Sequence, residues 1–276
     1  MNLSKYKDLP VVDGEGFLFA FSGIDGETRY APNFVLARHS TGYDFLVQTE
    51  FLHELRIRTS RQGTVLAAVS DVYAVQFGQE TLVLTFSEWH TLIGQIPEQT
   101  SIALTNAKGE IASPVSPCNT QGGMLAFAID AGHFALAYGD TKEEARSRAE
   151  QGLTVLLENA VQERLLIYER FSHLKDSDEE RFLRKCLSVM KVNVMSAEGA
   201  FQQHWSTPDR VPHRDLWLWD SVFHSLGLNK VDRMLSWETL KSVLDQQHDN
   251  GMISHQCKPN GWRSGITQPP ILAWGV

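Results

Sequence analysis

The residues of this chain best suited to chemistry form one short segment in its last quarter. The segment reads Leu216-Trp217-Leu218-Trp219-Asp220, so two tryptophans flank a leucine and a carboxylate follows at once. Flat indole faces stack on the C–H faces of sugar rings, while a carboxylate accepts strong, charge-assisted hydrogen bonds from the ring hydroxyls. Small-molecule sites are mostly apolar, with a few placed polar groups of this kind. The segment therefore indicates a wall of a carbohydrate-binding site.

A second informative segment runs from Gln268 to Trp274, close to the end of the chain. Its first residue, Gln268, is of a type that reads sugar hydroxyls. Proline is tolerated in the first helical turn, so Gln268-Pro269-Pro270 favours a helix start, with an apolar helix from Ile271. So few residues remain before Val276 that the helix would be marginal, because helix nucleation is costly. We therefore expect a chain that is cut before its natural end.

These side chains also have purely structural interpretations. Asp is a preferred N-cap residue, so Asp220 is also a candidate cap for the helix that follows it. Trp217 and Trp219 are two residues apart and would point to different sides of a helix, so one of them belongs in a core. Arg214 and Asp215 favour a structural ion pair.

The histidines in this region are weaker candidates. We expect His213 and His224 to lie near a core rather than to act as ligands. His248, His255 and Cys257 resemble a metal-ligand set in composition, but their spacing fits no standard zinc pattern. No metal and no cofactor are predicted.

Composition narrows the class of protein. At 276 residues the chain is long enough for two domains, and 42% hydrophobic with 21% charged residues is ordinary for a well-packed protein. A formal net charge of −8 argues against nucleic-acid and anionic-membrane partners, and no apolar stretch is long enough to span a bilayer. Three widely spaced cysteines favour reduced thiols, and so a cytoplasmic protein.

The first half of the chain has the pattern of a β-sandwich. Apolar and polar residues alternate in short runs between residues 14 and 138, for example around Leu55 and Leu84, and glycine-containing turns separate the runs. We predict an antiparallel β-sandwich domain over residues 1–140 with a structural role. The turn at residues 21–26 is predicted to close a hairpin, with a reach toward the helical half as the alternative.

The second half has helical periodicity. Thr141 and Glu144 form a capping-box pattern, which predicts a long helix to about Phe171 and a linker helix over residues 141–175. A similar start signal follows at Ser177, and further amphipathic patterns occur later, most clearly over residues 231–247. This half is predicted to be all-α and built from helical hairpins.

The motifs of the last quarter resemble glycoside hydrolase family 63, whose relatives include mannosylglycerate hydrolases and, more remotely, trehalases. The resemblance is carried by Trp217-x-Trp219-Asp220-Ser221-x-Phe223-His224, Gly227-Leu228, Asn250-Gly251-Met252-Ile253 and Gln268-Pro269-Pro270. It implies a multidomain α+β fold, in which an N-terminal β-sandwich precedes an (α/α)6 toroid. Residues 176–276 would form the N-terminal part of this toroid, leaving it incomplete.

The resemblance also implies an activity. Members of the family resemble inverting α-glycosidases, which use one carboxylic acid and one carboxylate base. The family's acid lies in a Ser-Gly-x-Asp-Asn motif that does not occur in this chain, so the catalytic residues are expected beyond Val276. The substrate would be a small glycoside or oligosaccharide. The residues carried over as substrate-binding are Trp217, Trp219, Asp220, His255 and Gln268.

The alternative function is a non-catalytic carbohydrate-binding protein, or an inactive remnant of a glycosidase. Coding sequence beyond Val276 with the acid motif and a later glutamate would favour hydrolysis, whereas an immediate stop codon would favour the alternative. An incomplete toroid exposes apolar helix faces, so we also expect self-association.

Overall fold

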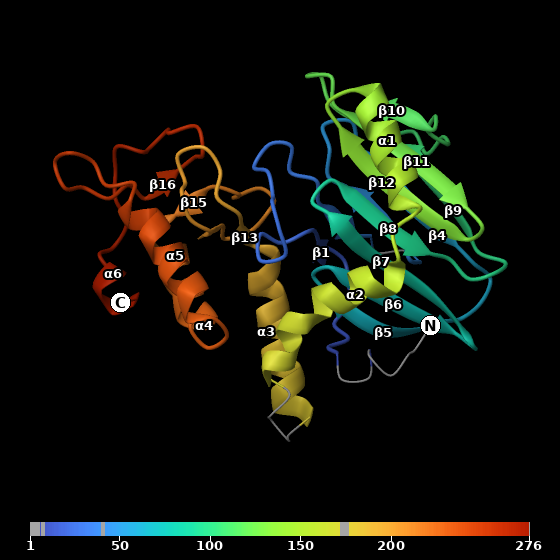
Figure 1. Cartoon of the computed structure of the whole chain (residues 1–276), viewed down its shortest axis with the longest axis horizontal. Helices are drawn as coiled ribbons and strands as arrows, with labels where there is room; N and C mark the ends of the chain where they lie inside the picture. Colours follow the sequence, from blue (N-terminus) through green and yellow to red (C-terminus); the bar gives the residue numbers. More distant parts are fainter. Residues whose placement is uncertain (1–5, 7–8, 40–41, 172–176, 276) are drawn as a thin grey trace. The chain divides into compact units, whose positions relative to one another are not determined.

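The computed structural model describes residues 6, 9–39, 42–171 and 177–275 (Figure 1). The chain divides into two compact units. Unit 1 comprises residues 1–21 and 33–185, and unit 2 comprises residues 22–32 and 186–276. A short segment from the N-terminal part of the chain therefore belongs to the same unit as the C-terminal quarter.

Unit 1 contains two antiparallel sheets, which confirms that the first half of the chain is built from short strands. The five-stranded sheet has the order β1 (Leu18–Phe19), β2 (Leu36–Arg38), β3 (Phe45–Val47), β4 (His53–Arg58) and β9 (Ser101–Asn106). The seven-stranded sheet has the order β10 (Val115–Pro117), β11 (Met124–Asp130), β12 (His133–Gly139), β8 (Thr91–Gln95), β7 (Glu80–Glu88), β6 (Val72–Phe77) and β5 (Thr64–Val69).

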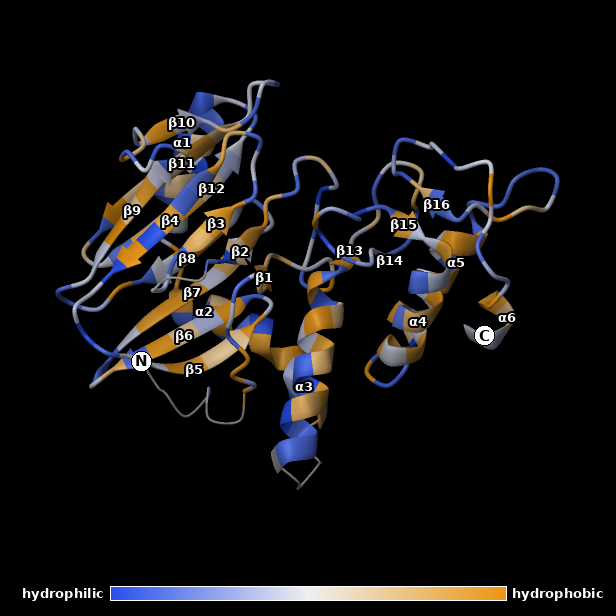
Figure 2. Cartoon of the chain, turned by 180° about the vertical axis from the view of Figure 1, so that it is seen from behind, coloured by the Kyte–Doolittle hydropathy of each residue, from blue (hydrophilic) through white to orange (hydrophobic). Residues whose placement is uncertain are grey.

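Both sheets contribute to a single hydrophobic core, as expected of a sandwich-like arrangement. Along β4 the side chains alternate between buried and more exposed positions, as the period-two pattern predicts. Phe45 and Leu55 of the five-stranded sheet and Leu84 and Phe86 of the seven-stranded sheet belong to one cluster and are fully buried. Figure 2 shows the apolar residues concentrated in strands such as β6 and β7.

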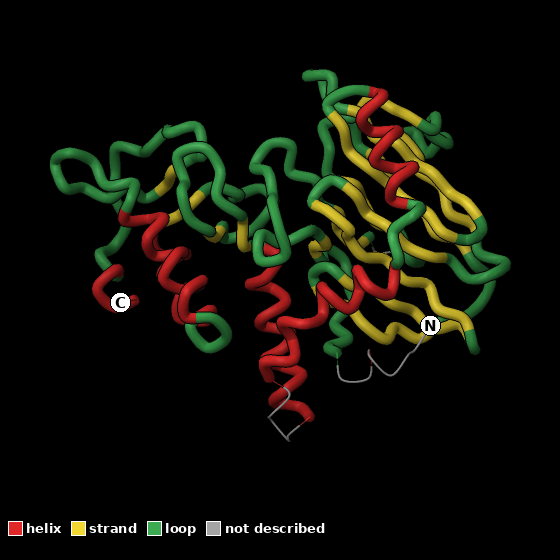
Figure 3. Tube along the Cα trace, viewed as in Figure 1, coloured by secondary structure: helices red, strands yellow, loops and turns green. Residues whose placement is uncertain are grey.

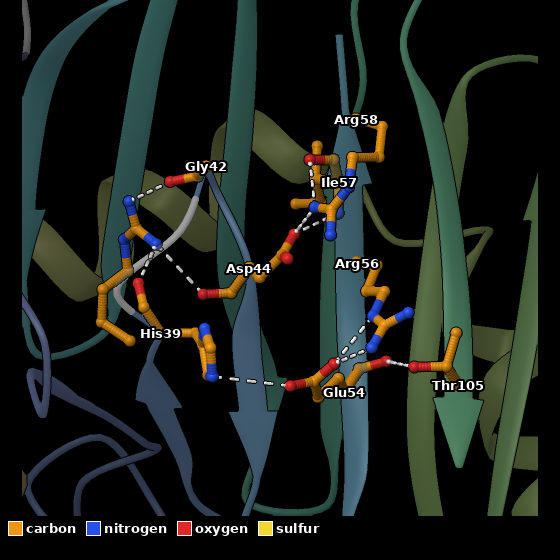
Figure 4. Close-up of polar contacts among 9 residues, drawn as sticks. His39, Gly42, Asp44, Glu54, Arg56, Ile57, Arg58 and Thr105 are labelled. Carbon is orange, nitrogen blue, oxygen red and sulfur yellow. Dashed lines mark hydrogen bonds and ion pairs between the residues drawn. The ribbon is translucent and has the colours of Figure 1, made fainter. Parts of the chain in front are cut away.

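Charged residues within the five-stranded sheet are paired with one another (Figure 4). The buried carboxylate of Asp44 accepts hydrogen bonds from the Ile57 amide at 2.9 Å and from the Arg58 guanidinium. Glu54 and Arg56 form an ion pair at 2.7 Å on the same strand. The pairing of Asp44 satisfies a buried charge.

The capping box at residue 141 is confirmed. Helix α1 (Lys142–Gly152) begins after Thr141, whose hydroxyl accepts from the Glu144 amide at 3.2 Å, while the Glu144 carboxylate accepts from the Asp140 amide at 2.7 Å. Ala145 and Ala149 of this helix are buried against alanines of β11 and β12. Small side chains on both surfaces allow the helix to lie close to the sheet.

The prediction of one continuous helix from residue 141 to 171 is wrong. The chain breaks after Gly152 and continues as α2 (Leu157–Leu165) and the 3-10 helix η2 (Leu166–Phe171). A Cβ at Gly152 would lie 2.8 Å from the Ala135 side chain and 3.0 Å from that of Thr91, so the last residue of α1 packs closely on the sheet. Residues 172–175 of the predicted linker helix lie outside the described residues.

The second half is not all-α as predicted. The described residues contain α3 (Ser177–Val192), α4 (Leu218–Leu228), α5 (Arg233–Leu244) and α6 (Leu272–Gly275). Four two-residue strands also occur, and they pair as β13 (Val194–Met195) with β14 (Trp205–Ser206) and β15 (Leu216–Trp217) with β16 (Gln256–Cys257). Long loops join these strands (Figure 3), and strands of two residues are too short to leave a periodic pattern in the sequence.

A buried aromatic cluster forms the core of unit 2. Trp205 is fully buried and packs with Phe201, their ring centroids 5.0 Å apart. Leu218 at the start of α4 and Val243 near the end of α5 belong to the same cluster. The structure therefore places the start of α4 on a rigid apolar base. None of the described helices is both long enough and apolar enough to cross a membrane.

Replacement of Gly94 by alanine tests the close packing of the seven-stranded sheet. A Cβ at this position would lie 2.6 Å from the Phe134 ring of the neighbouring strand. Overpacking of this kind costs about 1–3 kcal/mol, so Gly94→Ala should lower the free energy of unfolding by that amount in urea titrations followed by circular dichroism. Gly14→Ala is the control, because nothing lies within 4 Å of its Cβ. Equal stability of the two variants would contradict this packing.

Candidate functional site

The candidate residues gather where a strand passes directly into a helix. β15 pairs antiparallel with β16, with Trp217 opposite Gln256. The pairing continues through the Leu218 amide, which donates to the His255 carbonyl at 3.1 Å. Helix α4 begins at Leu218, so Trp217 is the last residue of the strand, and Asp220 lies in the first helical turn.

Two histidine rings flank the indole of Trp217. The ring centroids of Trp217 and His255 lie 5.4 Å apart at an interplanar angle of 82°, and those of Trp217 and His213 lie 6.2 Å apart at 76°. Nδ1 of His255 lies 2.5 Å from the Ser264 hydroxyl oxygen, which holds that ring in place. The indole nitrogen of Trp217 is buried and has no hydrogen-bond partner among the described residues. The orientation of the indole therefore depends on its neighbours and on its strand.

Gln268 caps the start of α4. Its Oε1 accepts a hydrogen bond from the Trp219 amide at 2.9 Å. The N-cap residue itself, Trp217, makes no side-chain capping hydrogen bond. This contact brings Gln268 to the same turn as Trp219, whose side chain is 42% exposed. With the oxygen engaged, the amide nitrogen of Gln268 is the group suited to a ligand.

Asp220 is not the N-cap residue of the helix, so its assignment as the N-cap is wrong. It lies three residues after the N-cap position, in the first turn. Burial raises the pKa of its carboxyl group, an effect opposed by its own amide, by Trp219 and by positive charge at His213. A carboxylate held partly out of water, beside two exposed or half-buried indoles, has acceptor capacity for sugar hydroxyls.

His224 lies one helical turn beyond Asp220 on α4 and is partly buried. Burial lowers the pKa of its imidazole to about 4. The ring is therefore neutral at pH 7, in agreement with the expectation of a histidine near the core.

The predicted pairing of Arg214 with Asp215 is replaced by other contacts. One carboxylate oxygen of Asp215 accepts from the Tyr30 hydroxyl at 2.6 Å, and the other accepts from the Gln256 side chain. The Arg214 guanidinium carbon lies 4.5 Å from the centre of the Tyr30 ring. Both residues thus contact Tyr30, which lies in the segment 22–32 of unit 2.

The segment 22–32 also belongs to this region, and sequence analysis gave its reach toward the helical half only as an alternative. Hydrogen bonds tie it to the rest of unit 2, from the Gly23 amide to the Val194 carbonyl at 2.8 Å and from the Thr28 amide to the Ser196 hydroxyl at 2.8 Å. Asp25 forms a buried ion pair with Lys191 at 2.9 Å. The turn at residues 21–26 therefore reaches the helical half, which was the alternative to a hairpin.

The described residues contain no group of three or more His, Cys, Asp or Glu side chains that could hold a metal ion. Among the residues considered for zinc, His248 Nε2 lies 2.7 Å from the Ser254 hydroxyl oxygen. Cys257 is buried, which raises the pKa of its thiol to about 11. A thiol of this kind is a poor metal ligand at neutral pH, because the thiolate is the form that binds.

Substitution of His224 should make unit 2 more resistant to acid. The pKa of His224 in the folded protein is about 4, below the ordinary value of about 6.5. As the pH falls, the imidazole is therefore protonated in the unfolded chain before it is protonated in the folded protein. The free energy of unfolding then decreases as the pH drops from about 6.5 toward 4. His224→Gln should remove roughly 2 kcal/mol of the loss measured between pH 7 and pH 4.5. Urea unfolding followed by tryptophan fluorescence reports this unit, which holds six of the seven tryptophans.

The control for this experiment is His133→Gln, because His133 is exposed on β12. It should leave the loss of stability at low pH unchanged. Equal acid sensitivity of the His224 variant and the parent protein would contradict a buried, neutral imidazole.

Known proteins match the part of the chain that contains these residues. Residues 212–276 match the family model of the mannosylglycerate hydrolase MGH1-like glycoside hydrolase domain. The mannosylglycerate hydrolases MGH1 and MGH2 of Selaginella moellendorffii are each 35% identical over 78 residues, covering 22% of this chain and 16% of each relative. The mannosylglycerate hydrolase of Thermus thermophilus is 31% identical over 107 residues, covering 32% of this chain and 25% of that protein.

These matches confirm the resemblance predicted from the motifs of the last quarter. The chain spans between 16% and 25% of the length of these curated relatives. All five predicted site residues, from Trp217 to Gln268, fall inside the matched range. Over residues 212–276 the chain is therefore similar to the mannosylglycerate hydrolase MGH1-like glycoside hydrolase domains.

Proposed function

We propose that residues 212–276 form the sugar-binding part of a glycoside hydrolase that acts on mannosylglycerate or a similar small glycoside. The observation that carries the proposal is the grouping of candidate residues at the start of α4, inside the matched range. Trp217 contacts His255 there, Gln268 caps the turn, and Asp220 lies in that turn.

Each side chain has a role in this proposal. A sugar ring stacks its C–H face on an indole, and the exposed edge of Trp219 makes that residue the more accessible of the two tryptophans. The carboxylate of Asp220 accepts hydrogen bonds from neighbouring hydroxyls and so selects their configuration. A site built to pair hydroxyls rejects analogues that lack them, because its own polar groups are left unpaired.

Bond cleavage is assigned to other groups. Inversion at the anomeric carbon needs an acid and a base about 6.5–9.5 Å apart, with water between them. The Ser-Gly-x-Asp-Asn motif that supplies the acid in the related family is absent from these 276 residues. In that family the toroid brings the acid and the base to the pocket that holds the glycone. We propose that α4 and α5 form one hairpin of such a toroid.

Calorimetric titration with mannosylglycerate tests the proposal. Asp220→Asn should weaken binding by about 10- to 100-fold, the worth of a hydrogen bond to a charged group. Because burial raises the pKa of Asp220, the same change should leave the stability at pH 7 undiminished. Trp217→Ala should abolish measurable binding, and none of these proteins should release mannose.

Asp245→Asn is the matched control, because Asp245 pairs with Lys241 at the end of α5 and has no proposed contact with sugar. Undiminished affinity of Asp220→Asn would remove this carboxylate from the site. Binding that is absent in the parent chain would contradict the proposal as a whole, and turnover by the parent chain would overturn the assignment of cleavage to absent groups.

We also propose that unit 2 associates with a second copy through an exposed aromatic face. Phe223 of α4 and Trp274 of α6 pack edge to face with centroids 6.0 Å apart, yet remain 51% and 65% exposed. Exposed apolar patches of this kind mark interaction surfaces.

Light scattering measures this association. The parent chain should show a mass above 31.1 kDa that rises with concentration. The double variant Phe223→Lys with Trp274→Lys should be monomeric, whereas Phe182→Lys on α3, where Phe182 is 67% exposed, should behave like the parent. A parent chain that stays monomeric at every concentration would contradict the proposal.

A further inference from the structure

We infer that Tyr30 is a positioning residue for the candidate site, acting through the carboxylate of Asp215 on the strand that carries Trp217. The inference concerns a residue far from the matched range, 185 positions before Asp215 in the chain. The effect of Tyr30 on sugar affinity rests on the proposed function. The effect of Tyr30 on the position of Trp217 does not depend on that function and can be measured without a ligand.

The carboxylate of Asp215 joins three separate segments. Oδ1 accepts from the Tyr30 hydroxyl at 2.6 Å, and Oδ2 accepts from Gln256 Nε2. Asp215 stands directly before β15, and Gln256 is the residue of β16 opposite Trp217. The Tyr30 hydroxyl is therefore connected to both strands of the pair through one side chain.

Tyr30 is held firmly enough to act as an anchor. Its amide donates to Glu198 Oε2 at 2.7 Å, and the centre of its ring lies 6.5 Å from that of the fully buried Trp205. The guanidinium carbon of Arg214 lies over the Tyr30 ring, 4.5 Å from its centre. Burial, followed by the hydrogen bond and charge of Asp215, raises the pKa of the Tyr30 hydroxyl. The hydroxyl therefore keeps its proton and remains a donor to Asp215.

The strand pair needs this support because it is very short. β15 and β16 contain two residues each, and a short two-stranded ribbon is marginal on its own. The Trp217 indole nitrogen has no partner among the described residues, so no hydrogen bond of its own fixes the ring. Asp215 is 7% exposed, and loss of one donor leaves a buried acceptor unsatisfied. A shift of this carboxylate then moves the strand and its indole together.

Tyr30→Phe removes one hydroxyl and keeps the ring. Tyr138→Phe is a matched control, because the Tyr138 hydroxyl also donates to an aspartate, Asp140, at 3.0 Å in unit 1. Both variants are labelled with 5-fluorotryptophan, and the Trp217 resonance in the ¹⁹F NMR spectrum is assigned from its absence in Trp217→Phe. Tyr30→Phe should shift or broaden this resonance, and Tyr138→Phe should leave it unchanged.

Titration with mannosylglycerate supplies the second measurement. Tyr30→Phe should weaken binding by about 10-fold, or about 1.4 kcal/mol, which is in the lower part of the range for leaving a buried acceptor unsatisfied. Tyr138→Phe should bind like the parent chain. Asp215→Asn, which keeps the shape of the side chain, should move the Trp217 resonance in the same way and serves if Tyr30→Phe does not fold.

The two measurements separate the inference from the proposed function. An unmoved Trp217 resonance in both Tyr30→Phe and Asp215→Asn would overturn the positioning role. A parent chain that does not bind mannosylglycerate, together with a displaced Trp217 resonance in Tyr30→Phe, would overturn the proposed function and leave the positioning role supported.

Discussion

The carboxylate of Asp215 is almost excluded from solvent and takes hydrogen bonds from Tyr30 and Gln256. A buried charge is tolerated only where donors meet it, so the segments that carry those donors must come together at this point. Asp215 lies two residues before Trp217. The hydrogen bonds to Asp215 therefore also position the strand that carries Trp217. They link the segment 22–32 to the last quarter of the chain.

Local signals predicted much of the secondary structure. The alternation in β4 and the capping box at Thr141 are both present in the structure, because each depends only on neighbours in the chain. The close packing of Gly152 could not be predicted, since it involves Ala135 and Thr91 across the interface. A glycine in a helical pattern does not reveal what packs against it.

The same distinction holds for the site. Trp217, Trp219 and Asp220 are adjacent in sequence, so any local structure keeps them near one another. Gln268 accepts a hydrogen bond from the Trp219 amide, and this role as a helix cap did not follow from the pattern. Tyr30 carried no signal at all, because a tyrosine in a polar turn indicates nothing about a partner 185 residues later.

The central claim is that a sugar binds at the start of α4. A crystal structure of this chain with mannosylglycerate tests it most directly. The expected result is a sugar ring against Trp217 or Trp219, with a hydroxyl within hydrogen-bond distance of the Asp220 carboxylate. A sugar bound instead in the groove of unit 1 formed by residues 50–53 and 106–117 would contradict the claim.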